Sequence, residues 1–242
     1  MTTTVAAQSV NAGSEVLAWL RGAITVLFVV ALPLLLISTN VRLLFTDRDF
    51  ILQGFYDNQV ELTTGLDRAQ LAQVATGLVH YFQAPPGPFN QQVTVAGQPR
   101  PLFNQKEVDH MVDVQALVQA FFRIQIIAAV IVLARVVLAL AGERSAHWLG
   151  RDMLLSAALA VGVVLVVGVA AAVDFDRLWT AFHHVAFRND FWLLDPRTDY
   201  LIKLFPEPFW FTATFRLATA MTVGTVLVAV AGFAAWRWSV PR

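Results

Sequence analysis

The chain has 242 residues, of which 57% are hydrophobic and only 14% are charged, and its formal net charge is zero. Soluble domains carry roughly 25% charged residues, so this composition indicates a membrane protein. No basic tail or face points to nucleic acid as a partner. The sequence contains no cysteine, which excludes disulfides, thiolate nucleophiles and cysteine-based metal sites.

Four apolar stretches are long enough to cross a bilayer as helices, which takes about 20 residues. They run from about residues 17 to 38, 118 to 140, 153 to 173 and 211 to 236. The first stretch is interpreted as a retained anchor, because no basic residue precedes Arg21 and no small-x-small cleavage site follows. The predicted fold is an all-α membrane protein, a single integral membrane domain over residues 1–242.

Four spans place both termini on one side of the membrane. Arginines occur in the short connector between the second and third spans and in the C-terminal tail: Arg144, Arg151, Arg237 and Arg242. The positive-inside rule therefore predicts that the termini and this connector are cytoplasmic. The two long connectors, residues 39–117 and 174–210, then face outward and are expected to carry short interfacial helices.

The first long connector contains "TTGLDRAQLAQVATGLVHYFQ", which predicts an amphipathic helix. Thr64 and Asp67 form a capping-box-like start. Apolar residues then recur at helical spacing: Leu71, Val74, Ala75, Leu78, Val79 and Phe82. After it, "QVTV" before "AGQP" is a candidate small strand pair.

The end of this connector, "NQKEVDHMVDVQALVQAFFRIQ", predicts a helix that continues into the second span. Asn104 followed by Glu107 is an N-cap pattern. One helical face carries Glu107, His110, Val114, Leu117 and Phe121. Asp113 borders this face, so His110 is expected to face the interior just outside the membrane. The alternative is that Glu107 only caps the helix and His110 is a packed interfacial histidine.

The second long connector begins with "DFDRLWTAFHHVAF", for which Asp174 is a plausible N-cap. An apolar stripe follows at helical spacing: Phe175, Leu178, Trp179, Phe182, His183 and Ala186. His183 lies in the stripe, whereas His184 falls on a polar edge. His110 and His183 are therefore predicted to face inward from separate helices at the same depth, where a histidine can act as base and then as acid.

Zinc binding is the competing interpretation of the same residues. His110, His183 and Glu107, with either Asp195 or Asp199, could ligate zinc. No short ligand spacing such as HExxH occurs, so no metal or other cofactor is predicted.

The rest of this connector predicts a turn at Asp195–Pro196 and a short interfacial helix from about Thr198 to Pro206, with Asp199 capping or supporting its start. Arg123 and Arg216 lie a few residues inside spans. Intramembrane charge is costly and often functional, but both arginines could equally extend their guanidinium groups to the surface.

Two segments, "LFNQKEVDHMVDV" and "FHHVAFRNDFWLLDPRTDYLIKLFPEPFW", resemble the lipoprotein intramolecular transacylase (Lit) family of four-span bacterial membrane proteins. Weaker support comes from Asn40 after the first span, Tyr56 in "FY" and Tyr81 in "HYF". The resemblance covers almost the whole chain. It implies an enzyme of the bacterial plasma membrane that acts at the outer face.

The family enzyme moves the sn-2 acyl chain of a diacylglyceryl lipoprotein to the α-amine of its N-terminal cysteine. The resemblance implies that His110 and His183 are catalytic and that diacylated lipoprotein N-termini and membrane phospholipid are the partners. A substrate amine is the nucleophile, so no cysteine or GxSxG serine is needed.

Supporting residues are also expected in this interpretation. Glu107, Asp113 or Asp195 could fix an imidazole tautomer, Arg123 or Arg216 could hold polar substrate groups, and the role of His184 stays open. Two other functions remain as alternatives: a metal-dependent membrane hydrolase and a non-enzymatic lipid-binding protein.

Overall fold

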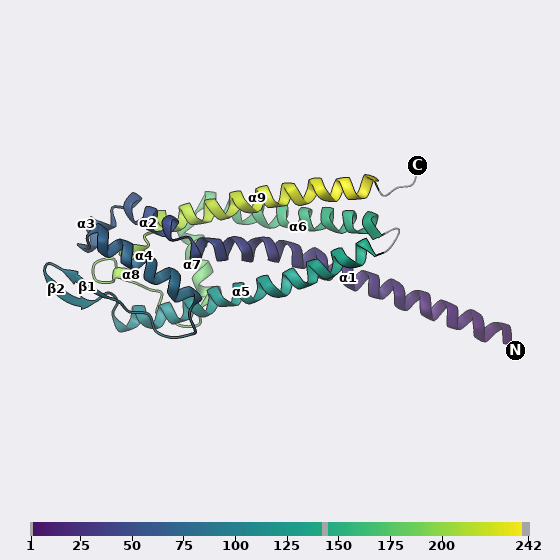
Figure 1. The fold of residues 1–242 in the computed structure, drawn as a ribbon, viewed down its shortest axis with the longest axis horizontal. Coiled ribbons are helices and arrows are strands. Elements are labelled where there is room, and N and C mark those ends of the chain that lie inside the picture. Colours follow the sequence, from purple (N-terminus) through teal and green to yellow (C-terminus); the bar gives the residue numbers. More distant parts are fainter. Residues whose placement is uncertain (1, 142–144, 239–242) are drawn as a thin grey trace. The chain divides into compact units, whose positions relative to one another are not determined.

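The computed structural model describes residues 2–141 and 145–238, most of them in helices (Figure 1). Arg144 and Arg242, two of the arginines used to predict the orientation, lie outside these ranges. The chain groups into two compact units. Unit 1 comprises residues 1–36, 125–163 and 222–242, and unit 2 comprises residues 37–124 and 164–221. Whether they act as one domain stays a prediction.

Four helices contribute a part to each unit: α1 (Thr2–Thr46), α5 (Gln105–Leu140), α6 (Ser145–Val173) and α9 (Glu207–Trp238). Each contains one segment long and apolar enough to cross a membrane: Trp19–Thr46, Gln105–Leu140, Ala146–Val173 and Glu207–Arg237. The prediction of an all-α protein with four spans is confirmed. The helices extend beyond the predicted spans because hydropathy marks the part that fits hydrocarbon, whereas the helix itself ends only at its caps.

Shorter elements fill the two long connectors, all in unit 2. They are α2 (Arg48–Asp57), α3 (Val60–Thr64), α4 (Arg68–Gln83), β1 (Gln92–Val95), β2 (Gln98–Pro101), α7 (Phe175–Ala186) and α8 (Tyr200–Leu204). The sequence patterns had indicated α4, α7, α8 and the strand pair, but not α2 or α3.

The start of α4 corrects one prediction. Asp67 is the N-cap, and its carboxylate accepts a hydrogen bond from the Gln70 N–H at 2.8 Å. Thr64, predicted to share this cap, is instead the last residue of α3, where its hydroxyl donates to the Val60 carbonyl at 2.6 Å. Gly65, at φ +71°, separates the two helices in a left-handed conformation that favours glycine.

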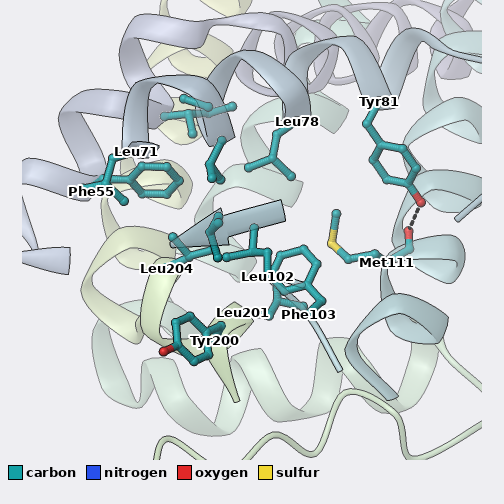
Figure 2. Packing of buried hydrophobic residues seen from close by; sticks show 14 of the residues in the cluster. Phe55, Leu71, Leu78, Tyr81, Leu102, Phe103, Met111, Tyr200, Leu201 and Leu204 are labelled. Carbon is teal, nitrogen blue, oxygen red and sulfur yellow. Dashed lines mark hydrogen bonds between the residues drawn. The ribbon is translucent and has the colours of Figure 1, made fainter. Parts of the chain in front are cut away.

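The apolar stripe of α4 builds the core of unit 2 (Figure 2). Its leucines pack against residues from the strand pair, the start of α5 and α8, and the fully buried set includes Leu71, Leu78, Leu102, Phe103 and Leu204. Burial of one such side chain contributes about 1.5–3 kcal/mol. The short helices are too short to be stable alone, so this shared core fixes them and, with them, the first turns of α5.

The predicted strand pair is confirmed as an antiparallel hairpin with Val93 opposite Arg100. Its two turn residues, Ala96 and Gly97, both have positive φ, at 50° and 77°, as a two-residue hairpin requires. The outer edge of β1 is covered by the Gln70 amide, which bonds both the N–H and the carbonyl of Thr94. The hairpin therefore does not present a free strand edge at that residue.

Unit 1 contains a charged pair between its apolar helix segments. The Arg135 guanidinium of α5 lies 2.9 Å from the Asp152 carboxylate of α6, and both side chains are almost fully buried. The Thr25 hydroxyl of α1 donates to the same carboxylate at 3.1 Å. The sequence pattern did not single out this pair, because Arg135 lies inside the predicted second span and Asp152 immediately before the third, and only tertiary packing brings them together.

Candidate functional site

Helix α7 places the two adjacent histidines in different environments. The Asp174 carboxylate accepts from the Arg177 N–H at 2.9 Å, which fixes the start of the helix as predicted. With the start fixed, helical spacing turns His183 inward, where it is only 8% exposed, whereas His184 is exposed. The predicted difference between the two neighbours is confirmed.

Helix α5 begins with the predicted reciprocal cap. The Glu107 carboxylate accepts from the Asn104 N–H at 2.8 Å, and the Asn104 side-chain oxygen accepts from the Glu107 N–H at 3.1 Å. One turn later, His110 is only 5% exposed. The predicted inward orientation of His110 is therefore observed.

The two buried imidazoles lie together within unit 2. The ring centroids of His110 and His183 are 6.1 Å apart, with an angle of 34° between the ring planes. The two residues are 73 positions apart in the sequence and lie on separate helices, α5 and α7. The fold thus brings together the pair that the sequence patterns had placed at one depth.

The tautomer of His183 is fixed by its own helix. Its Nδ1 lies 2.8 Å from the Trp179 carbonyl oxygen, four residues earlier. A carbonyl only accepts, so Nδ1 carries the proton, and in the neutral ring Nε2 has the free lone pair. His183 is therefore oriented as a base through Nε2.

The Nδ1 atom of His110 differs from that of His183 in its hydrogen bonding. Its Nδ1 is buried and has no hydrogen-bond partner within the described part of the chain. Buried polar atoms are nearly always paired, and an exception calls for an explanation, such as a catalytic role. The hydrogen-bonding capacity of this nitrogen is therefore unused within the described residues.

Aromatic rings surround His183. Their centroids lie between 4.8 and 5.6 Å from the imidazole: Trp179, Trp192, Phe182 and Phe187. Phe187 also packs edge-on against His110 at 5.0 Å. Burial in this apolar wall lowers the pKa of His183 below 6.5, although the Trp179 carbonyl partly opposes the shift. The buried surroundings therefore favour the neutral imidazole of His183 over the cation.

Three acidic residues predicted to support the site are placed differently. Glu107 uses its two oxygens for the N–H groups of Asn104 and Leu201, so it joins α5 to α8. Asp199 is buried and accepts from the Asp195 N–H at 2.8 Å, which holds the turn before α8. Asp195 pairs with Arg197, which lowers its pKa to about 2. These contacts hold backbone segments in place, and the tautomer-fixing role considered for Glu107 and Asp195 stays a prediction.

Asp113 lies on α5 one helical turn after His110. It is half-buried and accepts from the Asn189 side-chain amide at 2.8 Å. The Tyr81 hydroxyl, also in this region, donates to the Met111 carbonyl at 2.8 Å (Figure 2). Burial, with a smaller contribution from the Asp113 charge, raises the pKa of Tyr81 to about 12.

The remaining predicted residues have local partners or lie at the surface. Arg216 pairs with Asp47 at 2.7 Å, which accounts for its charge near a helix end. Tyr56 is half-buried beneath the Arg68 guanidinium, 5.0 Å from its ring centroid. Arg123 is exposed on α5, and Asn40 is half-buried on α1.

The zinc set considered from the sequence is not assembled. Across residues 2–141 and 145–238, no group of three or more histidine, aspartate or glutamate side chains is arranged to hold a metal ion. Glu107 and Asp199 are instead directed at backbone N–H groups and at Asn104.

Fold and site together define a four-span membrane protein with two facing histidines buried in an aromatic wall. Comparison with known proteins identifies the family. The model of the lipoprotein intramolecular transacylase Lit family matches residues 26–210, and the chain belongs to this family. Its members are intramolecular transacylases of lipoproteins.

Solved structures with the same fold come from the Lit transacylase of Bacillus cereus. One matches with a TM-score of 0.74 at 14% sequence identity, covering 92% of this chain and 96% of that chain. Two variants of the same protein, with a histidine replaced by arginine or by alanine, match with TM-scores of 0.68 and 0.67, also at 14% identity. They cover 95% and 93% of this chain and 96% of their own. No match was found among curated proteins.

Proposed function

We propose that this chain is a membrane acyltransferase that converts a diacylated lipoprotein to its lyso form. The sn-2 acyl chain moves from the glycerol oxygen to the α-amine of the N-terminal cysteine of the same molecule. Membership of the Lit family supports the reaction class. The observation that supports the chemistry is the pair of buried imidazoles, His110 and His183, with ring centroids 6.1 Å apart.

His183 is the general base in this proposal. Its Nδ1–H is bound to the Trp179 carbonyl, so Nε2 presents the lone pair. Burial keeps the ring neutral at pH 7, as a base must be before it accepts a proton. Nε2 takes the proton from the amine as the nitrogen attacks the ester carbonyl carbon.

His110 assists the carbonyl or leaving oxygen. Its Nδ1 is buried without a protein partner in the described residues, and a neutral imidazole can donate from one nitrogen. In the reaction the new C–N bond forms, the ester C–O bond breaks, and the proton lost by nitrogen is returned to the glycerol oxygen by the histidine pair. Atoms and charge balance without a cofactor or an enzyme nucleophile.

Asp113 supports this centre electrostatically. It follows His110 by one helical turn and is held by the Asn189 amide, so its negative charge favours a positive charge nearby. The substrate's α-ammonium and a protonated histidine are the two cations of the reaction. His184, which is exposed, is assigned no direct role.

The site is proposed to face outward from the bacterial plasma membrane, with both termini in the cytoplasm. The even number of spans supports a common side for the two termini, and Arg151 and Arg237 near the other ends of the helices support the cytoplasm as that side. Diacylated lipoprotein N-termini enter from the outer leaflet, where phospholipid is the surrounding solvent.

The test is the mass of a lipoprotein's lipidated N-terminal peptide in a host that lacks this activity. The unaltered chain is expected to yield the lyso form, and His110→Asn with His183→Asn together are expected to yield none. His80→Asn is the control, because His80 is exposed on α4 and outside the site. Full synthesis of the lyso form by the folded double variant would contradict the mechanism.

A further inference from the structure

The loop between α7 and α8 carries a tryptophan that the proposed reaction has not used. Trp192 is half-buried, and its ring lies 5.0 Å from the His183 ring at an interplanar angle of 33°. Its other contact is edge-on with His184 at 4.9 Å and 86°. The indole plane is therefore closer to parallel with the buried imidazole and nearly perpendicular to the exposed one.

This loop is tied to the first turns of α5. The Asn189 amide donates to the Asp113 carboxylate at 2.8 Å. The Lys106 ammonium donates to the Leu193 carbonyl, immediately after Trp192. The two tethers lie on either side of the indole, so α5 fixes both His110 and the residue that packs on His183.

The end of the loop is fixed through the same helix. The Asp199 carboxylate accepts from the Asp195 N–H at 2.8 Å and from the Asn104 side-chain amide at 3.0 Å. Asn104 is itself the N-cap partner of Glu107. The position of Trp192 is thus set by contacts to α5 before, beside and after it.

We propose that Trp192 is a positioning residue whose indole face stabilises the positive charge that His183 acquires during acyl transfer. This inference rests on the proposed function, because it takes His183 as the base. A π-face is negative and attracts a cation placed over it, and tryptophan has the strongest effect among the aromatic residues. The contact favours the imidazolium over the neutral ring, so it acts mainly in the transition state.

A second possible role for Trp192, exclusion of water, predicts the opposite change in the pKa of His183 when the indole is removed. If the indole only kept the site dry, its removal would hydrate the imidazolium and raise the pKa of His183. If the indole stabilises the cation, its removal lowers that pKa further. The titratable groups around His183 are His184 on its own helix and His110 on α5, and the charges of Asp113 and Lys106 act on His110.

The experiment compares Trp192→Leu and Trp192→Phe with the unaltered chain by NMR titration of the His183 ring and by the pH profile of kcat/KM. The leucine variant is expected to lower the pKa of His183 and to reduce kcat/KM at neutral pH by about tenfold, with phenylalanine between the two. Trp19→Leu is the matched control, because Trp19 is 80% exposed in unit 1. Thermal unfolding checks that each variant is folded.

An unchanged or raised pKa of His183 in folded Trp192→Leu would overturn the inference. If the leucine variant is unfolded, the phenylalanine variant decides it by the same sign. This outcome is separate from failure of the proposed function, which would appear as lyso-form synthesis by the double histidine variant whatever the effect of Trp192.

Discussion

His183 and His184 are neighbours in the chain but differ in every property relevant to catalysis. His183 is buried, bonded through Nδ1 to the Trp179 carbonyl and packed among aromatic rings, whereas His184 is exposed. One step along a helix turns a side chain by about 100°, so a single α-helix with a defined start is sufficient for this difference. A base at the position of His184 would be solvated and would have no fixed tautomer.

The lowered pKa of His183 predicts the pH dependence of activity. Its folded pKa lies below 6.5 because burial disfavours the cation. The neutral ring, which is the base, predominates above this pKa and is lost as pH falls through it. The acid limb of kcat/KM for lyso-form synthesis is therefore expected to have its midpoint below pH 6.5. The same pH profile is measured for His80→Asn as a control. A midpoint at or above pH 6.5 in both enzymes would contradict the assignment of His183 as the base.

The sequence was sufficient to place both imidazoles but not their hydrogen bonds. Helical spacing and the two caps, Asp174 and the Asn104–Glu107 pair, determine which faces are buried, and these signals are local. The bond from the His183 Nδ1 depends on a side-chain rotamer, and the contact with Trp192 depends on how the loop of residues 187–199 returns to the helix. The spacing of residue types along the sequence predicts neither of these two contacts.

At the scale of elements, the N-terminus of α5 joins the two long connectors. Glu107 completes the cap of its own helix and also accepts from the Leu201 N–H of α8 at 2.6 Å, 94 residues later. The sequence predicted the first contact, because the spacing of three residues is diagnostic. It could not predict the second, because the partner is a backbone group brought close only by tertiary packing. Glu107, considered from the sequence as a support for an imidazole, therefore also forms a structural joint between α5 and α8.

Glu107→Ala tests this joint. The change leaves the partly buried N–H of Asn104 and the buried N–H of Leu201 without their acceptor, and an orphaned buried group costs about 1–3 kcal/mol. The free energy of unfolding in detergent is expected to fall by about 2–4 kcal/mol. Asp109→Ala is the control, because Asp109 accepts only from the exposed Gln105 amide. If the two variants lower the free energy of unfolding equally, the Glu107 contacts do not stabilise the fold more than the surface contact of Asp109 does.

At the scale of the whole molecule, unit 1 holds a buried ion pair between its apolar helices. Arg135 of α5 and Asp152 of α6 form a buried pair, joined by the Thr25 hydroxyl of α1. Three membrane helices thus meet at one carboxylate. Hydropathy could not reveal it, since two charges do not prevent a segment from scoring as apolar, and their partnership is a tertiary contact.

The Arg135–Asp152 pair predicts strong coupling between two substitutions. Asp152→Leu leaves the guanidinium buried and unpaired, which typically costs about 3–5 kcal/mol. Adding Arg135→Met removes the unpaired charge, so the double variant is expected to unfold at a higher temperature than Asp152→Leu alone. Thermal unfolding of the purified variants measures this. Additive losses in the double variant would mean that the two side chains are not coupled.

The orientation of the chain in the membrane gives the last prediction. The sequence has no cysteine, so a single introduced cysteine is the only thiol that a maleimide can label. Gln98 lies in the hairpin before α5, and Ala141 follows the last residue of the same helix, so a membrane-spanning α5 separates the two positions. Both side chains are exposed in the structure.

A membrane-impermeant maleimide added to intact cells is expected to label Gln98→Cys and to reach Ala141→Cys only after permeabilisation. The reason is the arginine bias, since Arg151 and Arg237 flank the side on which Ala141 lies. The unaltered chain, which has no thiol, is the control for background labelling. Labelling of Ala141→Cys alone in intact cells would place the histidine pair at the cytoplasmic face. The outward location in the proposed function would then be wrong. The chemistry of the pair would still be tested by the histidine variants.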